Sequence, residues 1–359
     1  MGGDEFAIIL RDQNSVEQVY AVCEKILKRV NEPVYLAKSR IEPGASIGIS
    51  ICFGGADSVQ CIMQNADIAL YEAKALGRAR YCLFNLEMKA KLDRRSDIEA
   101  RLCVALEENE FRLVYQPIYS GCSLQCRKLE ALIRWGAEGA IRYNPDEFIP
   151  VAEVTGEISA IGLWVLQEAI TEWKQWLAAD QSRCIAVNLS DVQLRDPELA
   201  AQFAEIVKDV GVSASQIELE LSERIVASNI GRIVSGNLDT LKDMGFRFAY
   251  DDFGTGQSSF MHLQKLPGAT LKIDQSFVNS MVDSEEAKKL VAGMINFAQR
   301  LGLSVVAEGV ETAAQVEQLR AFGCDYLQGY YLARPVPASA CSVLLQTVPG
   351  EAVEGRYAQ

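Results

Sequence analysis

Eight short apolar runs, each about as long as a strand, recur along the later part of the chain, mostly with helix-length segments between them. Eight strands within about 250 residues are the number and size of a (β/α)8 barrel. Only about a dozen residues separate the first two runs, too few for a crossover helix, so this pair is expected to be antiparallel. The runs lie near 112–116, 129–134, 185–190, 217–222, 246–251, 270–274, 303–308 and 325–328. The sequence therefore predicts an α/β fold built on a TIM-like barrel with an antiparallel first strand.

Polar side chains end almost every one of these runs. Barrels of this class carry their chemistry at the carboxyl ends of the strands, so these side chains are expected to converge on one mouth. Carboxylates that lie close together raise each other's pKa, and so many acids at one place require divalent cations. The side chains are those of Glu130, Asn188, Glu220, Glu223, Asp251, Asp252, Lys272, Asp274, Glu308, Glu311 and Gln328. Oxygen ligands without histidine suit Mg²⁺ or Mn²⁺.

The stretch from Ala249 to Gly256 presents two adjacent acids between an apolar run and a glycine-rich turn. A solvated Asp-Asp turn is one interpretation of this stretch, and a metal site is the other. Two ions about 3.5 to 4 Å apart would clamp a phosphodiester, with Asp251 bridging them and a shared water as the nucleophile. Lys272 would hold that water or stabilise the developing charge, although a lysine at a strand end is more often an ion-pair partner.

The composition limits the chemistry at that mouth. The chain has a net charge of −13 and a single histidine, His262. Binders of DNA or RNA carry a basic stripe that displaces counterions, so neither nucleic acid is an expected partner. One histidine cannot supply a two-histidine metal site and makes a Ser-His-Asp relay improbable. The ten cysteines follow no disulfide or zinc spacing, and their positions in apolar runs, as for Cys23, Cys52 and Cys184, favour buried reduced thiols.

Residues 1–85 form a first block of different character. Two glycines and two acids precede an apolar run that ends at Leu10, which predicts a hairpin turn followed by a strand. Apolar positions at the 3.6-residue period predict two helices in this block, and strands are expected between and after them. The helices are expected over 16–30 and 62–73, and the strands near 45–53 and 81–84. Residues 86–109 have mixed charge and no Gly or Pro, and they predict a connecting helix.

This first block resembles the C-terminal half of a GGDEF domain, the diguanylate cyclase module. The matching stretches are Gly2–Phe6, Ser46–Ile49, Asn65–Lys74 and Gly77-Arg78. The half that precedes the signature in that family is absent from this sequence, together with its metal-binding aspartate, guanine contacts and product-inhibition site. The resemblance therefore implies a partial α+β half-domain that cannot act as a cyclase and whose strand edges need a partner.

The later block resembles an EAL domain, the cyclic di-GMP phosphodiesterase family. Glu130-Ala131-Leu132 is the motif that gives this family its name, and Ile133-Arg134-Trp135 follows it. The further matches are Tyr115–Ile118, Phe148–Pro150 with Ala152-Glu153, Asn188–Ser190, Glu220–Glu223, Asp251–Gly256 with Ser258-Ser259, Leu271–Asp274, Glu308–Glu311 and Gln328–Tyr330. Three letters alone carry little weight, but nine ordered motifs at barrel spacing are specific, and they cover roughly residues 97–345.

The resemblance implies a role for each matching position. Two Mg²⁺ or Mn²⁺ ions would be held by Glu130, Asn188, Glu220, Asp251, Asp252 and, near the second ion or its waters, Glu308. Lys272 would contact the nucleophilic water, and the proton would go either to Glu308 or to a metal-bound hydroxide. The catalytic set is then Glu130, Asp252, Lys272 and Glu308. The supporting acids would be Glu223, which anchors the loop after the fifth strand, and Glu311. The substrate would be lined by Gln116, Asp274, Gln328 and, paired to a phosphate, Arg134.

The function expected from this resemblance is metal-dependent hydrolysis of cyclic di-GMP to linear pGpG, which lowers the level of a bacterial second messenger. The main alternative is a cyclic di-GMP receptor with little or no catalysis, although such receptors lose metal ligands and none is lost here. A diguanylate cyclase conflicts with the missing half-domain. An unrelated metal barrel would have to match all nine motifs by coincidence.

The predicted organisation has four parts: a partial GGDEF domain at 1–85, a connecting helix at 86–109, an EAL barrel at 110–345 and a tail at 346–359. The resemblance implies a homodimer through the EAL domain, although Gln257 replaces the usual aromatic residue in the loop associated with dimerisation. No apolar run approaches the roughly 20 residues that cross a bilayer, and no leader opens the chain. A cytoplasmic location is expected, with any membrane tether in a region outside this sequence.

Overall fold

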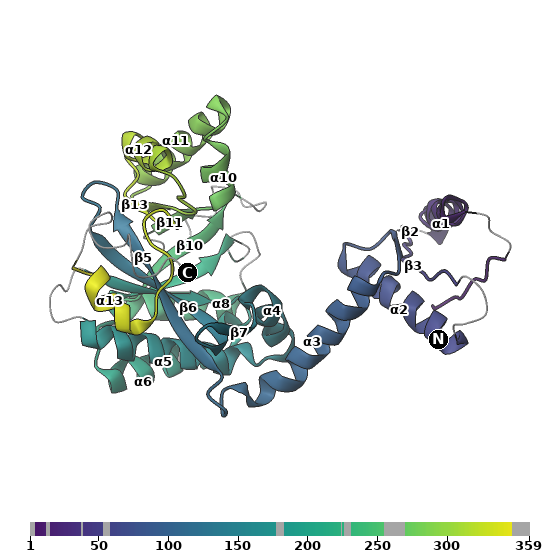
Figure 1. The fold of residues 1–359 in the computed structure, drawn as a ribbon, viewed down its shortest axis with the longest axis horizontal. Coiled ribbons are helices and arrows are strands. Elements are labelled where there is room, and N and C mark those ends of the chain that lie inside the picture. The colour runs from purple at the N-terminus through teal and green to yellow at the C-terminus, as the bar shows by residue number, and fades with distance from the viewer. Residues whose placement is uncertain are drawn as a thin grey trace. The chain divides into compact units, whose positions relative to one another are not determined.

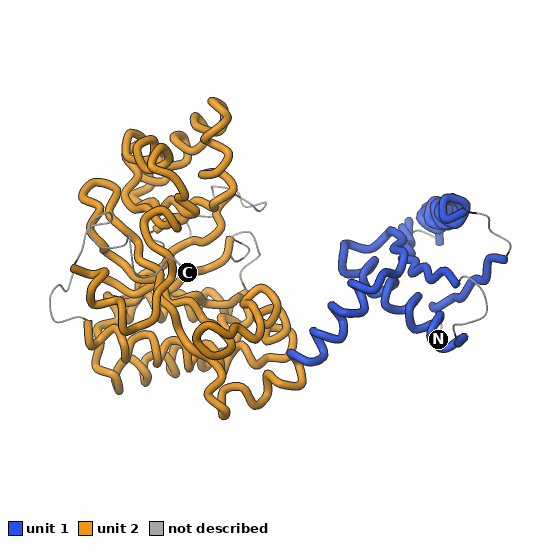
Figure 2. The backbone as a smooth tube through the Cα atoms, viewed as in Figure 1, with its two compact units in different colours: residues 1–98 blue, residues 99–359 orange. Residues whose placement is uncertain are grey.

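The structure, a computed structural model, describes residues 4–11, 15–36, 39–52, 58–176, 183–223, 225, 231–254 and 270–346. The chain divides into two compact units, residues 1–98 and 99–359 (Figure 2). The division falls within helix α3, Leu86–Ala105, where the connecting helix was expected. The Gly2-Gly3 pair, the segment with Gln257 and His262, and the tail beyond residue 346 lie outside the described residues.

The first unit contains helices and two small sheets. Helices α1, Val16–Val30, and α2, Val59–Ala75, form where the apolar period predicts them. Strand β3, Ile47–Ile49, pairs in parallel with β4, Tyr81–Leu83. Gly48 lets α2 pack directly on β3, because a Cβ at this position would lie 2.0 Å from a backbone oxygen of that helix. These elements agree with the expected α+β half-domain.

The first unit departs from the predictions in three places. No strand forms over residues 6–10, and Ile9 is 82% exposed. A strand needs a neighbour for its backbone N–H and C=O groups, and the described part of the chain places none beside this segment. An unpredicted antiparallel hairpin joins β1, Val34–Leu36, to β2, Ser39–Ile41. Cys52 is exposed rather than buried, since it lies beyond the end of β3.

The second unit is a closed eight-stranded barrel (Figure 1). Its strands are β5 Phe111–Ser120, β6 Cys126–Ala137, β8 Cys184–Leu189, β9 Ile217–Ser222, β10 Arg247–Phe253, β11 Thr270–Ile273, β12 Ser304–Ala307 and β13 Tyr326–Leu327. The hydrogen-bonded order is β5-β13-β12-β11-β10-β9-β8-β6, and β5 also pairs with β6, which closes the ring. β5 is antiparallel to both neighbours and all other neighbouring pairs are parallel, which confirms the predicted fold. One additional strand, β7 Ala140–Tyr143, extends β6 as a hairpin.

Helices surround this barrel (Figure 1). They are α4 Pro145–Thr155, α5 Ile158–Trp176, α6 Leu199–Val210, α8 Arg232–Asp243, α10 Gln275–Ser280, α11 Glu285–Arg300, α12 Ala313–Ala321 and α13 Ala338–Leu344, with short 3₁₀ turns η2 Gln193–Arg195 and η3 Ala214–Gln216. Local sequence sets their starts: Thr312 and Gln315 form a reciprocal capping box at the beginning of α12. Within the described ranges, no helix is both long and apolar enough to span a membrane.

Charged side chains occupy the barrel interior in two layers. In the lower layer, Lys128 Nζ lies 2.6 Å from Glu218 Oε1 and 3.0 Å from Thr270 Oγ1. Side chains alternate between the two faces of a strand, so the next inward residues on the same three strands come two positions later. These residues are Glu130, Glu220 and Lys272. The second layer therefore lies closer to the carboxyl ends of the parallel strands, where the candidate site is found.

Candidate active site

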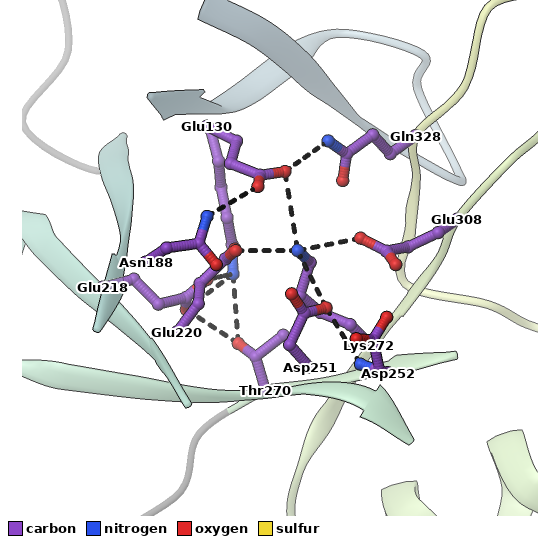
Figure 3. Close-up of polar contacts among 11 residues, drawn as sticks. Glu130, Asn188, Glu218, Glu220, Asp251, Asp252, Thr270, Lys272, Glu308 and Gln328 are labelled. Atoms are coloured by element: carbon purple, nitrogen blue, oxygen red, sulfur yellow. Dashed lines mark hydrogen bonds and ion pairs between the residues drawn. The ribbon is translucent and has the colours of Figure 1, made fainter. Parts of the chain in front are cut away.

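Lys272 lies at the centre of an acidic cluster (Figure 3) and is 1% exposed. Its Nζ lies 2.8 Å from Glu220 Oε2 and from Glu308 Oε1, 3.1 Å from Asp251 Oδ1 and 3.5 Å from Glu130 Oε2. Burial alone would lower the pKa of this lysine, but the charges of Asp251, Glu130, Glu220 and Glu308 raise it well above its usual value. Lys272 therefore stays charged and draws together acids from several strands.

Glu130 and Glu220 share this lysine but differ in their other partners. Glu130 also accepts hydrogen bonds from Gln328 Nε2 at 2.6 Å and from Asn188 Nδ2 at 3.1 Å. Burial opposes its ionisation, but the charge of Lys272 and these two amide donors hold the pKa of Glu130 below its usual value. Glu220 has no such donors, and burial together with the charge of Glu130 raises its pKa well above the usual value. Glu220 is therefore the harder of the two acids to ionise.

A local distortion of β10 brings both aspartates to the mouth. Adjacent residues of a regular strand point to opposite faces. The register between β10 and β11 shifts between Tyr250 and Phe253, and Asp252 has a φ of 55°. Left-handed backbone is uncommon in a non-glycine residue, although aspartate tolerates it better than most, and it turns the chain sharply at this point. Burial and the neighbouring Asp251 raise the pKa of Asp252. The bulge therefore allows both acids of the pair to serve one site.

Backbone hydrogen bonds hold the ends of the later strands together. Glu308 N donates to Ile273 O at 3.1 Å, and Gln328 N donates to Ala307 O at 2.9 Å. Burial, together with the charges of Asp251 and Glu130 and against that of Lys272, raises the pKa of Glu308 to about 8. This ladder fixes Glu308 and Gln328 on one side of Lys272, as Figure 3 shows.

The acidic mouth has the donors that a divalent cation needs. Oxygens of Asp251, Asp252 and Glu308 lie within 4.8 Å of one another. Two buried oxygens, Glu220 Oε1 and Gln328 Oε1, have no hydrogen-bond partner in the described part of the chain. A buried acceptor without a partner costs about 1–3 kcal/mol, and a bound cation or ligand would supply the missing interaction. The oxygen-only donor set fits Mg²⁺ or Mn²⁺.

A pocket of about 300 Å³ opens above this cluster. Its walls include eight of the side chains at strand ends named above: Glu130, Asp251, Asp252, Lys272, Asp274, Glu308, Glu311 and Gln328. One further predicted residue, Gln116, lines the same pocket. Asp274 also caps α10, because its Oδ1 accepts a hydrogen bond from Ser276 N at 3.0 Å. The structure thus brings most of the sequence-predicted positions to one concave surface.

Two wall residues with polar side chains had no role in the sequence-based prediction. Tyr330 and Gln275 line the pocket, and Tyr330 is 53% exposed with the Arg334 guanidinium 4.5 Å from its ring centre. Tyr330 belongs to the matched Gln328–Tyr330 motif, so the sequence indicated that it lies near the site. The sequence did not indicate that its side chain is exposed. Gln275 follows Asp274 directly, and nothing in the sequence distinguishes it from an ordinary first residue of a helix.

Arg134 does not line the pocket described above. Its Nη1 donates to Ile133 O at 2.8 Å, and the side chain is half-buried at the rim. Burial lowers the pKa of Arg134, and the positive charge of Arg112 lowers it further. Asn188 and Glu220, which also lie outside this pocket lining, instead contact wall residues from below, as their hydrogen bonds and ion pairs to Glu130 and Lys272 show.

Glu223 is buried behind the aspartate pair. Its Oε2 accepts a hydrogen bond from Gly254 N at 2.9 Å, directly after the bulge that holds Asp252.

Replacing Glu223 by glutamine is expected to weaken metal affinity by about 10- to 100-fold, as is typical of groups that orient metal ligands. The metal concentration for half-maximal activity or thermal stabilisation measures this effect. Glu205→Gln, on the exposed face of α6, is the matched control. An unchanged metal requirement in Glu223→Gln would contradict the prediction that Glu223 orients the metal ligands.

Comparison with known proteins supports the sequence-based resemblance. The EAL domain model matches residues 99–335, and the model for the diguanylate cyclase GGDEF domain matches residues 1–80. The chain belongs to the EAL domain family and carries a partial GGDEF domain before the barrel.

Two relatives named as cyclic di-GMP enzymes match most of this chain. The bifunctional diguanylate cyclase/cyclic di-GMP phosphodiesterase MucR of Pseudomonas aeruginosa is 35% identical over 94% of the chain and 49% of its own length. The cyclic di-GMP phosphodiesterase NbdA of the same organism is 32% identical over 96% of the chain and 44% of its own length. A solved PaMucR phosphodiesterase in complex with cyclic di-GMP is 36% identical, with a TM-score of 0.62 over 68% of this chain and 99% of its own. The chain thus spans about half the length of these curated relatives.

Proposed function

We propose that this chain is a metal-dependent phosphodiesterase that hydrolyses cyclic di-GMP to linear pGpG. The observation that carries the proposal is the charge of the mouth, where four carboxylates contact one ammonium group and a fifth, that of Asp252, lies beside two of them. Fully ionised, this set carries four net negative charges, which two divalent cations would balance. An anionic substrate would be repelled by the acids alone and attracted once the cations are bound. The names of MucR and NbdA support cyclic di-GMP as the substrate.

The residues that would hold the ions are Glu130, Asn188, Glu220, Asp251, Asp252 and Glu308. When bound, two Mg²⁺ or Mn²⁺ ions would polarise the phosphodiester and lower the pKa of the attacking water. The chain's own groups then complete the reaction. Water adds to phosphorus, the bond from phosphorus to the 3′ oxygen breaks, and that oxygen takes a proton to become a hydroxyl.

Glu308 is the group best placed to accept the proton of the attacking water. Lys272 is the group best placed to stabilise the charge that develops on the phosphate. Glu308 lies at the edge of the cluster, lines the pocket and is only half-buried, so its carboxylate can reach an entering water. Lys272 Nζ, 2.8 Å from Glu308 Oε1, would stabilise the negative charge that develops on the phosphoryl oxygens. Gln116 and Gln328 offer amide groups on the pocket wall for substrate contacts.

Metal affinity is expected to rise with pH between about 6 and 9. The pKa of Glu308 is raised to about 8, and those of Glu220 and Asp252 are also raised, so protons compete with the cation at lower pH. These raised values mean that the folded metal-free protein binds more protons than the unfolded chain, so its stability falls as pH rises through them. Calorimetric titration with Mn²⁺ in two buffers of different ionisation enthalpy counts the released protons. Binding without proton release, and with pH-independent affinity, would contradict the assigned ligand set.

The expected homodimer, the cytoplasmic location and the four-part organisation of the chain stay predictions. We propose that the partial GGDEF domain spans 1–85, the connecting helix 86–109, the EAL barrel 110–345 and the tail 346–359. Analytical ultracentrifugation of the chain with and without cyclic di-GMP measures the oligomeric state.

A further inference from the structure

Three consecutive cross-strand pairs line the inner face of the barrel between β5 and β6. Gln116 lies opposite Glu130, and the next pair toward the rim is Val114 with Leu132. Gln116, Glu130 and Leu132 all line the pocket. Side chains repeat on one face every second residue, so the following pair, Arg112 with Arg134, lies on the same inner face at the rim. Two arginines therefore stand side by side above the acidic cluster.

This pair of like charges has no carboxylate partner. Arg112 Nε donates to Gly136 O at 3.1 Å and Arg134 Nη1 donates to Ile133 O, both backbone carbonyls. No ion pair joins either guanidinium to an acid in the described part of the chain, although the charges of Glu130 and Asp146 attract Arg134 from a longer distance. Like charges directly opposite on neighbouring strands are destabilising. Both side chains are half-buried, so water screens their repulsion only in part.

Two arginines near the same edge of the barrel show the contrasting arrangement, in which guanidinium groups share an acid. Arg101 and Arg142 both contact the carboxylate of Glu110. Arg112 and Arg134 instead donate one hydrogen bond each within the described residues, and the strand register places both beyond Leu132, at the rim of the pocket rather than in its lining. Two guanidinium groups with open donors form a site for a phosphate, because their planar forks match its oxygens.

The distance between the arginine pair and the acidic cluster suits a substrate that carries a second phosphate. Arg134 is four residues beyond Glu130 on the same strand, which places their Cα atoms about 13 Å apart. The arginine side chains can reach back over part of that distance. A cyclic dinucleotide has a second phosphodiester across its ring from the one that is cleaved.

We propose that Arg112 joins Arg134 in binding the second, uncleaved phosphate of a cyclic dinucleotide and so makes the site selective for that class of substrate. The proposal rests on the proposed function. Arg112 is a binding residue in this account and takes no part in bond cleavage. Selectivity arises because a simple phosphodiester, with only one phosphate, gains nothing from the arginine pair.

The test compares Arg112→Gln with the wild-type chain on two substrates. With cyclic di-GMP, KM is expected to rise by roughly 10- to 100-fold, the range of a charge-assisted hydrogen bond, while kcat changes less than about twofold. With bis(p-nitrophenyl) phosphate, kcat/KM is expected to stay unchanged. Arg112→Lys should restore part of the affinity. Arg247→Gln, at the exposed start of β10, removes the same charge from the opposite end of the barrel and should behave as wild type on both substrates.

Other results would overturn this role. Equal losses on both substrates, or a lower melting temperature in Arg112→Gln without ligand, would indicate a structural arginine, since loss of a repulsive pair should leave stability equal or higher. An unchanged KM for cyclic di-GMP would also exclude the contact. If the wild type hydrolyses neither substrate, the proposed function fails, but titration of both proteins with labelled cyclic di-GMP still decides whether Arg112 binds it.

Discussion

Glu130→Ala is expected to lower kcat on cyclic di-GMP on the order of 1,000-fold, equivalent to about 4 kcal/mol in the activation barrier. Glu130 is 5% exposed, and its carboxylate contacts side chains from three other strands or strand ends of the site. It contacts Lys272 and accepts hydrogen bonds from Asn188 and Gln328. Its lowered pKa means that it is ionised at neutral pH and ready to bind a cation. The loss should appear in kcat measured at saturating Mg²⁺ or Mn²⁺.

The Glu130→Ala protein is nevertheless expected to remain folded. Two buried amide donors lose their acceptor, which costs about 1–3 kcal/mol each at most. Against this, Glu220 loses the repulsion of its neighbour, ionises more readily and takes a larger share of Lys272. Glu130→Gln keeps the size of the side chain and should be almost as inactive, because the charge is lost. Hydrolysis near the wild-type rate by a folded Glu130→Ala protein would contradict the assignment of Glu130 as a metal ligand.

Lys272→Met is expected to abolish activity and to lower the stability of the metal-free protein by about 3–5 kcal/mol, as when one partner of a buried ion pair is removed. Four carboxylates lie within 3.5 Å of its Nζ and would repel one another without it. They would take up protons, so the loss should be larger at pH 8.5 than at pH 6.5. Added Mn²⁺ should restore much of the stability but not the activity, because a cation replaces the charge but not the placement of the ammonium group.

Lys128→Met is the matched control for this prediction. Lys128 is also buried, on β6, and pairs with Glu218 at 2.6 Å in the layer below the site. Its loss should destabilise the barrel as well, but Mn²⁺ should not restore that stability, and the protein that remains folded should keep its activity. Equal Mn²⁺ rescue of the two variants, measured by thermal melting, would show that the rescue does not come from the acidic mouth.

The barrel was predictable because its strands are short, buried and separated by amphipathic helices. Parallel strands buried on both faces produce continuous apolar runs, and the polar residue after each run marks its carboxyl end. The antiparallel first strand followed from the short connection between β5 and β6. The candidate residues could therefore be assigned to one mouth from their positions at the strand ends, before any contact was known.

The finer geometry could not be predicted from the sequence. The bulge that turns Asp252 toward the site depends on a register shift between β10 and β11, which tertiary pairing decides. The four-acid environment of Lys272 depends on side chains from strands far apart in sequence. In the first unit, the apolar run at 6–10 predicts a strand locally, but a strand also needs a neighbour, and the described residues supply none. The unpaired state of Arg112 and Arg134 likewise becomes visible only from the register of β5 and β6.

The most direct test of the central claim is to incubate the purified chain with cyclic di-GMP and Mg²⁺ or Mn²⁺, with an EDTA control, and to separate the nucleotides by chromatography. The proposed function predicts pGpG that appears only when the metal is present. Binding of cyclic di-GMP without hydrolysis in either metal would contradict a phosphodiesterase and indicate a receptor instead.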